Sequence, residues 1–110
     1  MAVSERPWGS ITAADYRDAG AYCDACLINL NTGPRSGWTK DNCKLPVYEP
    51  DGDLNRGGAH GASAVLAGAR GGVNAPSSAK RAAARKLAGL YHGQLKEPPP
   101  ESLMRLAMDQ

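Results

Sequence analysis

The sequence lacks phenylalanine altogether, and four tyrosines and two tryptophans are its only aromatic residues besides histidine. Hydrophobic residues make up 42% of the 110 positions, but many of them are alanines, which bury little surface each. A chain of this length has room for one domain, and this composition gives that domain a thin core. We therefore expect modest stability, which docking on a partner would increase.

Long apolar segments are also missing. No run is long enough to cross a bilayer, and residues 1–8 contain no apolar core of a signal peptide. We expect a protein made in a cytoplasm, which stays there or is packaged into a particle assembled there. The net charge of +2 is smaller than is typical of a dedicated nucleic-acid-binding protein.

Cysteine is scarce, at three residues, and the odd number leaves at least one thiol free in the monomer. Three cysteines in a non-secreted chain do not suggest a disulfide framework. We interpret them as buried small thiols, and whether Cys26 and Cys43 pair as cross-strand neighbours stays open. An alternative is a zinc site, because a Cys-x-x-Cys spacing suits zinc. Its ligands would be Cys23, Cys26, Cys43 and His60.

Patterns of catalytic residues are weak. His60 and His92 are far apart in the sequence, and no Gly-x-Ser-x-Gly motif is present. The glycine pairs do not form a phosphate-binding loop with its lysine. We therefore predict that the protein is not an enzyme, and we assign no catalytic residue, no metal and no cofactor.

The sequence does contain an ordered series of short elements, which predicts an α+β fold. We expect a small two-stranded hairpin packed with an antiparallel, alanine-rich helix pair, plus short terminal helices. The strands are predicted over residues 25–30 and 43–48. The helices are predicted over 12–22, from Asp53 or Asn55 to Gly71-Gly72, over 77–93 and over 101–108. As domains, we expect an N-terminal arm at 1–11, one small domain at 12–95, and a proline-spaced tail at 96–110.

The second predicted helix has a single apolar stripe, formed by Ala62, Val65, Leu66 and Ala69. Its first turns contain Gly57, Gly58 and Gly61, and each glycine costs up to about 1 kcal/mol relative to alanine. Close approach of another element would explain these glycines.

A turn in the middle of the chain joins its two halves. Residues 44–56 read Lys-Leu-Pro-Val-Tyr-Glu-Pro-Asp-Gly-Asp-Leu-Asn-Arg, an apolar segment that runs into a Pro-Asp-Gly turn and a helix start. An alanine-rich helix, a Gly-Gly break and a helix ending in Leu90-Tyr91 follow. Over residues 43–95 this pattern resembles a small domain encoded among the head genes of tailed phages, especially those of actinobacterial hosts.

In that group the domain occurs alone or as an appendage of head proteins such as the maturation protease. The resemblance implies a structural virion protein: a capsid decoration or cement protein, or a minor head protein, that binds and stabilises the capsid shell. The implied partners are the major capsid protein and further copies of the chain at a symmetry axis. The implied location is the virion, after synthesis in the bacterial cytoplasm. It implies no membrane, and nucleic acid is not expected as a partner.

Two sets of side chains are candidates for contact with partners. Tryptophan is enriched at interface hot spots, and an amphipathic tail beyond a proline spacer can reach a neighbour or fold back. The interface candidates are Trp8, Trp38, Leu103, Met104 and Leu106. The second set is a basic helix face, formed by Lys80, Arg81, Arg85 and Lys86. Such a charge run is usually solvated, but it supports an alternative, a small nucleic-acid-binding or regulatory module. A zinc-stabilised adaptor is the other alternative.

Overall fold

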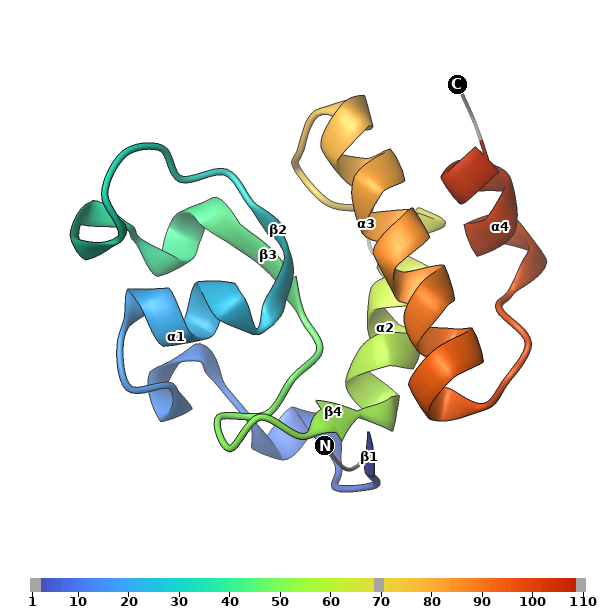
Figure 1. The fold of residues 1–110 in the computed structure, drawn as a ribbon, viewed down its shortest axis with the longest axis horizontal. Coiled ribbons are helices and arrows are strands. Elements are labelled where there is room, and N and C mark those ends of the chain that lie inside the picture. The colour runs from blue at the N-terminus through green and yellow to red at the C-terminus, as the bar shows by residue number, and fades with distance from the viewer. Residues whose placement is uncertain (1–2, 69–70, 109–110) are drawn as a thin grey trace. The chain divides into compact units, whose positions relative to one another are not determined.

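The computed structural model describes residues 3–68 and 71–108 and confirms the predicted α+β fold (Figure 1). Its internal packing divides into two units, Met1–Gly58 and Ala59–Gln110. The division falls within helix α2, which covers Arg56–Leu66. The predicted boundaries of an arm, a domain and a tail stay predictions. No helix among the described residues is long and apolar enough to span a membrane.

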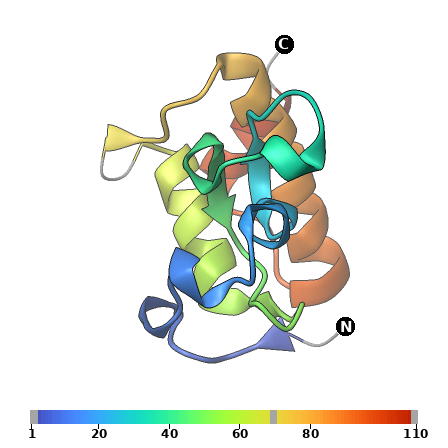
Figure 2. The ribbon, with the colours of Figure 1, turned by 90° about the vertical axis from the view of Figure 1, so that its left-hand side faces the viewer.

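The first unit contains the predicted hairpin. Strands β2 (Cys26–Asn29) and β3 (Cys43–Pro46) pair antiparallel, with Ile28 opposite Lys44. Helix α1 (Ala19–Asp24) packs against both strands and is seen nearly end-on in Figure 2. The connection between the strands carries two 3-10 turns, η3 (Arg35–Gly37) and η4 (Lys40–Asn42).

The predicted helix over residues 12–22 is wrong in its first half. Thr12 and Asp15 do form a helix-type cap at the predicted start, with the Thr12 N–H donating to Asp15 Oδ2 at 2.8 Å, but the cap serves only a 3-10 turn, η2 (Ala13–Asp15). The chain is extended at Tyr16, and α1 starts after Asp18, whose carboxylate accepts from the Ala21 N–H at 2.8 Å. A second capping residue therefore resets the helix start.

The cysteine interpretation also needs correction. Cys23 on α1 and Cys43 on β3 form a disulfide across a sequence separation of 20 residues, and Cys26 is the free cysteine. Cys26 cannot be the cross-strand partner of Cys43, because the register places Cys26 opposite Pro46 and Cys43 opposite Asn29. The disulfide ties the hairpin to α1.

The mid-chain turn is closed by strand β1 (Val3–Ser4), which pairs parallel with β4 (Leu54–Asn55). Asn55 is fully buried; its Nδ2 donates to Arg6 O at 3.0 Å and to Glu49 Oε2 at 2.8 Å. Its Oδ1 accepts from the Gly58 N–H at 2.7 Å and so caps the start of α2. One side chain thus links the N-terminal segment, the turn and the helix.

Glu49 lies in the same cluster with only 2% of its surface exposed. Burial acts to raise its pKa, but hydrogen bonds from Ser4 and Asn55 and the charge of Arg6 outweigh that, so the pKa of Glu49 lies below its ordinary value. The Arg6 guanidinium donates to Glu49 Oε1 at 3.1 Å. The carboxylate is therefore held in its charged form inside the first unit.

The second unit is built from helices. Helix α3 (Ser77–Leu90) continues into a π-helical turn, η6 (Tyr91–Leu95), and α4 (Glu101–Met108) packs along α3 (Figure 1). The side chains buried on these two helices are small or aliphatic: Ala83, Ala84, Leu87, Ala88, Leu103 and Ala107. Small residues allow close approach of helices. The C-terminal tail therefore folds back on its own unit.

Helix α2 ends earlier than the Gly71-Gly72 break that the sequence suggested. Gly68 adopts a left-handed backbone (φ +108°), and its N–H donates to Val65 O at 3.0 Å. A glycine in this conformation stops a helix, so α2 ends at Leu66. Ala69, the last position of the predicted stripe, lies outside the described residues.

Candidate functional site

The two tryptophans, both in the first unit, differ in their surroundings. Trp8 is half-buried, and its ring lies against Gly58: a Cβ built on Gly58 would be 3.0 Å from Trp8 Cδ2. This close approach explains one of the α2 glycines, whereas nothing lies within 4 Å of the corresponding point on Gly61. Trp8 therefore packs on its own unit.

Trp38 lies on the loop that connects the two hairpin strands, where it is half-buried. Its indole Nε1 donates to Gly33 O at 3.2 Å, and the Arg35 guanidinium lies 5.5 Å from the ring centroid. A cation at this distance interacts favourably with an indole face. The indole is thus oriented by its own loop.

The same arginine fastens the loop to α1. Arg35 donates to both carboxylate oxygens of Asp24, at 2.8 and 2.7 Å. This bidentate pair lowers the pKa of Asp24: the hydrogen bonds from Arg35 have the largest effect, burial opposes them, and the arginine charge lowers the pKa further. The guanidinium passes over Gly20, where a Cβ would be 2.6 Å from Arg35 Nε. Gly20, Arg35 and Trp38 are among the residues that line a hollow of about 360 Å³.

A second set of hydrogen bonds holds the loop that carries Trp38. Asn31 Nδ2 donates to Thr39 O at 3.1 Å, and the Thr39 N–H returns a hydrogen bond to Asn31 Oδ1 at 3.0 Å. Lys40 reaches Ala13 O with its Nζ at 2.8 Å. The Trp38 loop, residues 30–42, is therefore braced on both sides of the tryptophan.

The tail candidates lie within the second unit. Leu103 is only 1% exposed and packs in the α3–α4 contact, while Met104 and Leu106 are half-buried. The exposed apolar side chain of this helix is Met108, at 71%, which the sequence argument did not single out. Their assignment as contacts to a partner stays a prediction, and Leu103 already serves the chain's own core.

The four basic residues all lie on α3. Lys80 and Arg81 are half-buried, and Arg85 and Lys86 are exposed. Arg85 Nε donates to Ala107 O at 2.9 Å, which fastens the end of α4. At 100° per residue, Arg81, Arg85 and Lys86 lie on the side of α3 away from the buried alanines, whereas Lys80 lies on the side of Ala83, Ala84 and Leu87. The four residues therefore do not share one face, and Arg85 also has a structural bond.

The zinc alternative is wrong. The disulfide uses Cys23 and Cys43, which removes two of the three proposed thiolates, and His60 instead pairs with Glu97. Across residues 3–68 and 71–108, no cluster of three or more histidines, cysteines or acidic residues could hold a metal. Burial raises the pKa of the remaining thiol, Cys26, to about 12, which makes it a poor nucleophile.

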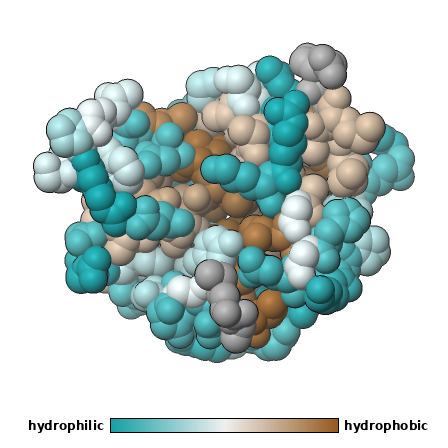
Figure 3. Space-filling view, in the orientation of Figure 1, coloured by the Kyte–Doolittle hydropathy of each residue, from teal (hydrophilic) through white to brown (hydrophobic). Residues whose placement is uncertain are grey.

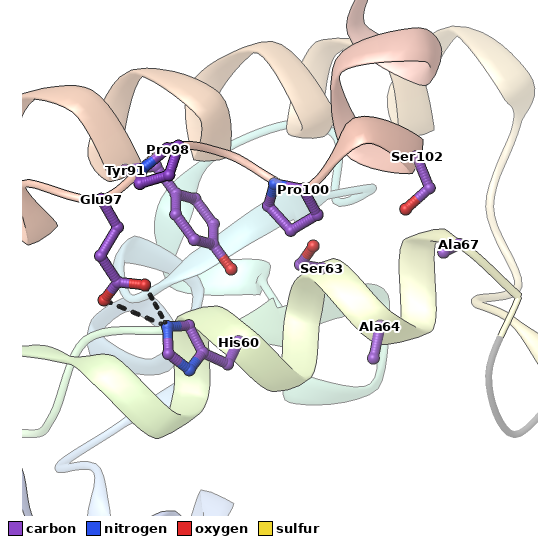
Figure 4. A pocket seen from close by; sticks show the side chains of 9 residues that line it. All are labelled: His60, Ser63, Ala64, Ala67, Tyr91, Glu97, Pro98, Pro100 and Ser102. Atoms are coloured by element: carbon purple, nitrogen blue, oxygen red, sulfur yellow. Dashed lines mark hydrogen bonds and ion pairs between the residues drawn. The ribbon is translucent and has the colours of Figure 1, made fainter.

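A further hollow, of about 450 Å³, lies in the second unit between α2, the segment 97–100 and the start of α4 (Figure 4). His60 Nε2 lies 3.0 Å from Glu97 Oε1, and the imidazole stacks on Tyr91 with centroids 5.8 Å apart. Burial raises the pKa of Tyr91 against the opposing effect of a hydrogen bond with Ser63.

The remaining lining is small: alanines, two prolines and Ser102. The sequence pattern offers His60 as a candidate zinc ligand and does not reveal this arrangement, since Glu97 lies 37 residues away with no motif that joins the two. The His60–Glu97 pair holds the segment before α4 against α2. Glu97 is engaged with His60, and Tyr91 is hydrogen-bonded with Ser63, so the described contacts hold segments together and do not align a nucleophile with a base.

No family model matches the chain, and neither the curated proteins nor the solved structures that were compared with it include a match.

Proposed function

We propose that this protein is a structural component of a tailed-phage virion, a capsid decoration or cement protein or a minor head protein, that binds and stabilises the major capsid shell. The observation that carries the proposal is the resemblance of residues 43–95 to a small domain encoded among phage head genes.

Four positions of the turn, within the segment that carries the resemblance, are interior. Val47, Leu54 and Asn55 are fully buried, and Glu49 is nearly so. These residues specify how the turn packs, so the pattern is informative about the domain. The surface that meets a partner is expected elsewhere.

The Trp38 loop supports the proposal as a docking element. Its indole is partly exposed and is held by the Arg35 contact and the Gly33 hydrogen bond. A pre-oriented aromatic anchor loses little entropy on binding. In a shell, many copies of one weak contact add up.

The test is co-sedimentation of the purified protein with heads of the phage whose genome encodes it. We expect binding, and we expect Trp38→Ala to weaken it by about tenfold or more, as for an interface hot spot. Ser36→Ala, an exposed change in the same loop, is the matched control and should bind normally. A protein that stays in the supernatant at micromolar concentration with heads in excess would overturn the proposal.

A further inference from the structure

The charge of this protein is divided unevenly between its two units. Residues 1–58 hold six Lys/Arg and eight Asp/Glu, whereas residues 59–110 hold seven and three. The near-neutral total of +2 therefore conceals a net charge of about −2 in the first unit and +4 in the second. The small total charge therefore does not exclude a polyanionic partner for the second unit.

The two acidic side chains that the structure describes in the second unit are engaged away from α3. Glu97 is engaged with His60, and Glu101 pairs with Arg105 one helical turn later. Among the described residues, none forms an ion pair with Lys80, Arg81 or Lys86. Their charge is available for a partner.

The outer face of α3, which we define as Arg81, Ala82, Arg85, Lys86 and Gly89, lies opposite the buried alanine and leucine side. At 100° per residue, Ala82 and Gly89 occupy its centre, with the arginines on one side and Lys86 on the other. Both central residues are exposed. Nothing lies within 4 Å of a Cβ built on Gly89. In Figure 3, hydrophilic residues lie beside weakly hydrophobic ones over the region of α3.

Arg85 is positioned rather than neutralised by its structural bond. Its Nε donates to Ala107 O at 2.9 Å, and a carbonyl oxygen carries no net charge. The guanidinium therefore keeps its charge and has further N–H groups besides Nε. Arg81 lies one turn away, about 6 Å along the helix axis.

We propose that the outer face of α3 binds the phosphate backbone of double-stranded nucleic acid without sequence preference. The low centre of this face lets the helix approach a duplex, and the flanking cations reach phosphates. The face carries no aromatic side chain on which unpaired bases could stack, which favours a duplex over a single strand. This inference does not depend on the proposed virion role.

The test is the affinity of the full chain for a fluorescent 20-base-pair duplex of mixed sequence, measured as a function of salt. Three phosphate contacts predict a log–log slope of about −3. Arg81→Gln with Lys86→Gln should weaken binding and reduce the slope by about 2. Far-UV circular dichroism of the variant should match that of the wild type, because both side chains lie on the outer face.

The matched control is Arg17→Gln with Lys44→Gln, which removes the same charge from the first unit and should leave the slope unchanged. Three results would overturn the proposal. The wild type does not bind the duplex at 50 mM salt; the control pair weakens binding as much as the α3 pair; or polyglutamate competes as well as an unlabelled duplex does, which would indicate an acidic protein surface as the partner.

Discussion

The two units hold themselves together by different means. The first has short elements joined by one disulfide, by bidentate Arg35 and by buried amide and carboxylate groups around Asn55. The second has longer helices whose alanines and leucines pack directly. A thin set of large apolar residues can therefore be compensated in two ways: by specific polar and covalent links, or by helices that approach closely.

The largest expected effect is on the helical unit. Leu87 is fully buried on α3, and Leu87→Ala should lower the free energy of unfolding by about 2–5 kcal/mol through lost burial and a cavity. Urea unfolding followed by far-UV circular dichroism measures this loss. The half-buried Leu90 is the control, and Leu90→Ala should cost clearly less. Equal losses would mean that packing on α3 does not dominate this unit.

Reduction of the disulfide should weaken the other unit. Opening a link with a separation of 20 residues removes about 3 kcal/mol in the chain-entropy model. Both tryptophans lie in residues 1–58, so their fluorescence reports on this unit. We expect the thermal transition that they report to move to lower temperature with a reducing agent. Without the reducing agent, Cys26→Ala should leave this transition in place. An unchanged transition under full reduction would show that the disulfide does not stabilise the first unit.

The buried carboxylate gives the first unit a pH dependence. Because the pKa of Glu49 is lowered on folding, its stabilisation is complete above the ordinary glutamate range and is lost as pH falls below that range, through the folded pKa. Glu49→Gln should cost about 1 kcal/mol at pH 7 by weakening charged hydrogen bonds. It should also flatten the acid limb of the stability curve.

The control for this change is Asp41→Asn, on an exposed residue of the same unit. It should keep the wild-type slope with pH. If the Glu49 variant and the wild type lose stability in parallel between pH 5 and 3, the carboxylate does not stabilise the fold as described.

The smallest expected effect separates two glycines of one helix. Gly61→Ala should stabilise the protein by up to about 1 kcal/mol, since the methyl group enters open space. Gly58→Ala should lose that gain or destabilise by about 1 kcal/mol, because the new methyl displaces the Trp8 ring. Thermal unfolding and tryptophan emission measure the pair. An equal gain at both positions would show that the Trp8 contact is dispensable.

The sequence predicted an element correctly where only one local pattern was present. The last helix occurs at the predicted residues 101–108, and α3 starts at Ser77 as expected, because a proline precedes each segment and few alternatives exist. The hairpin follows from two apolar segments separated by turn residues. These features depend on neighbours in the chain.

The failures share a different cause. Thr12 and Asp18 both offer a helix cap, and tertiary contacts decided between them: the Tyr16 hydroxyl bonds to Tyr48 O, which needs an extended segment before α1. The disulfide and the His60–Glu97 pair join residues 20 and 37 positions apart. No local sequence pattern identifies partners that are so far apart in the chain. For this reason the spacing of the cysteines did not predict the Cys23–Cys43 pair.

The crosslink between α1 and β3 makes the protein's environment part of its structure. Glutathione keeps thiols reduced in a typical cytosol, so a chain folding there would first acquire its hairpin without that brace. Transfer to air-equilibrated buffer would then complete it. Freshly lysed and aged preparations of one sample would thus differ in thermal stability. A melting temperature should therefore be reported together with the redox history of the sample.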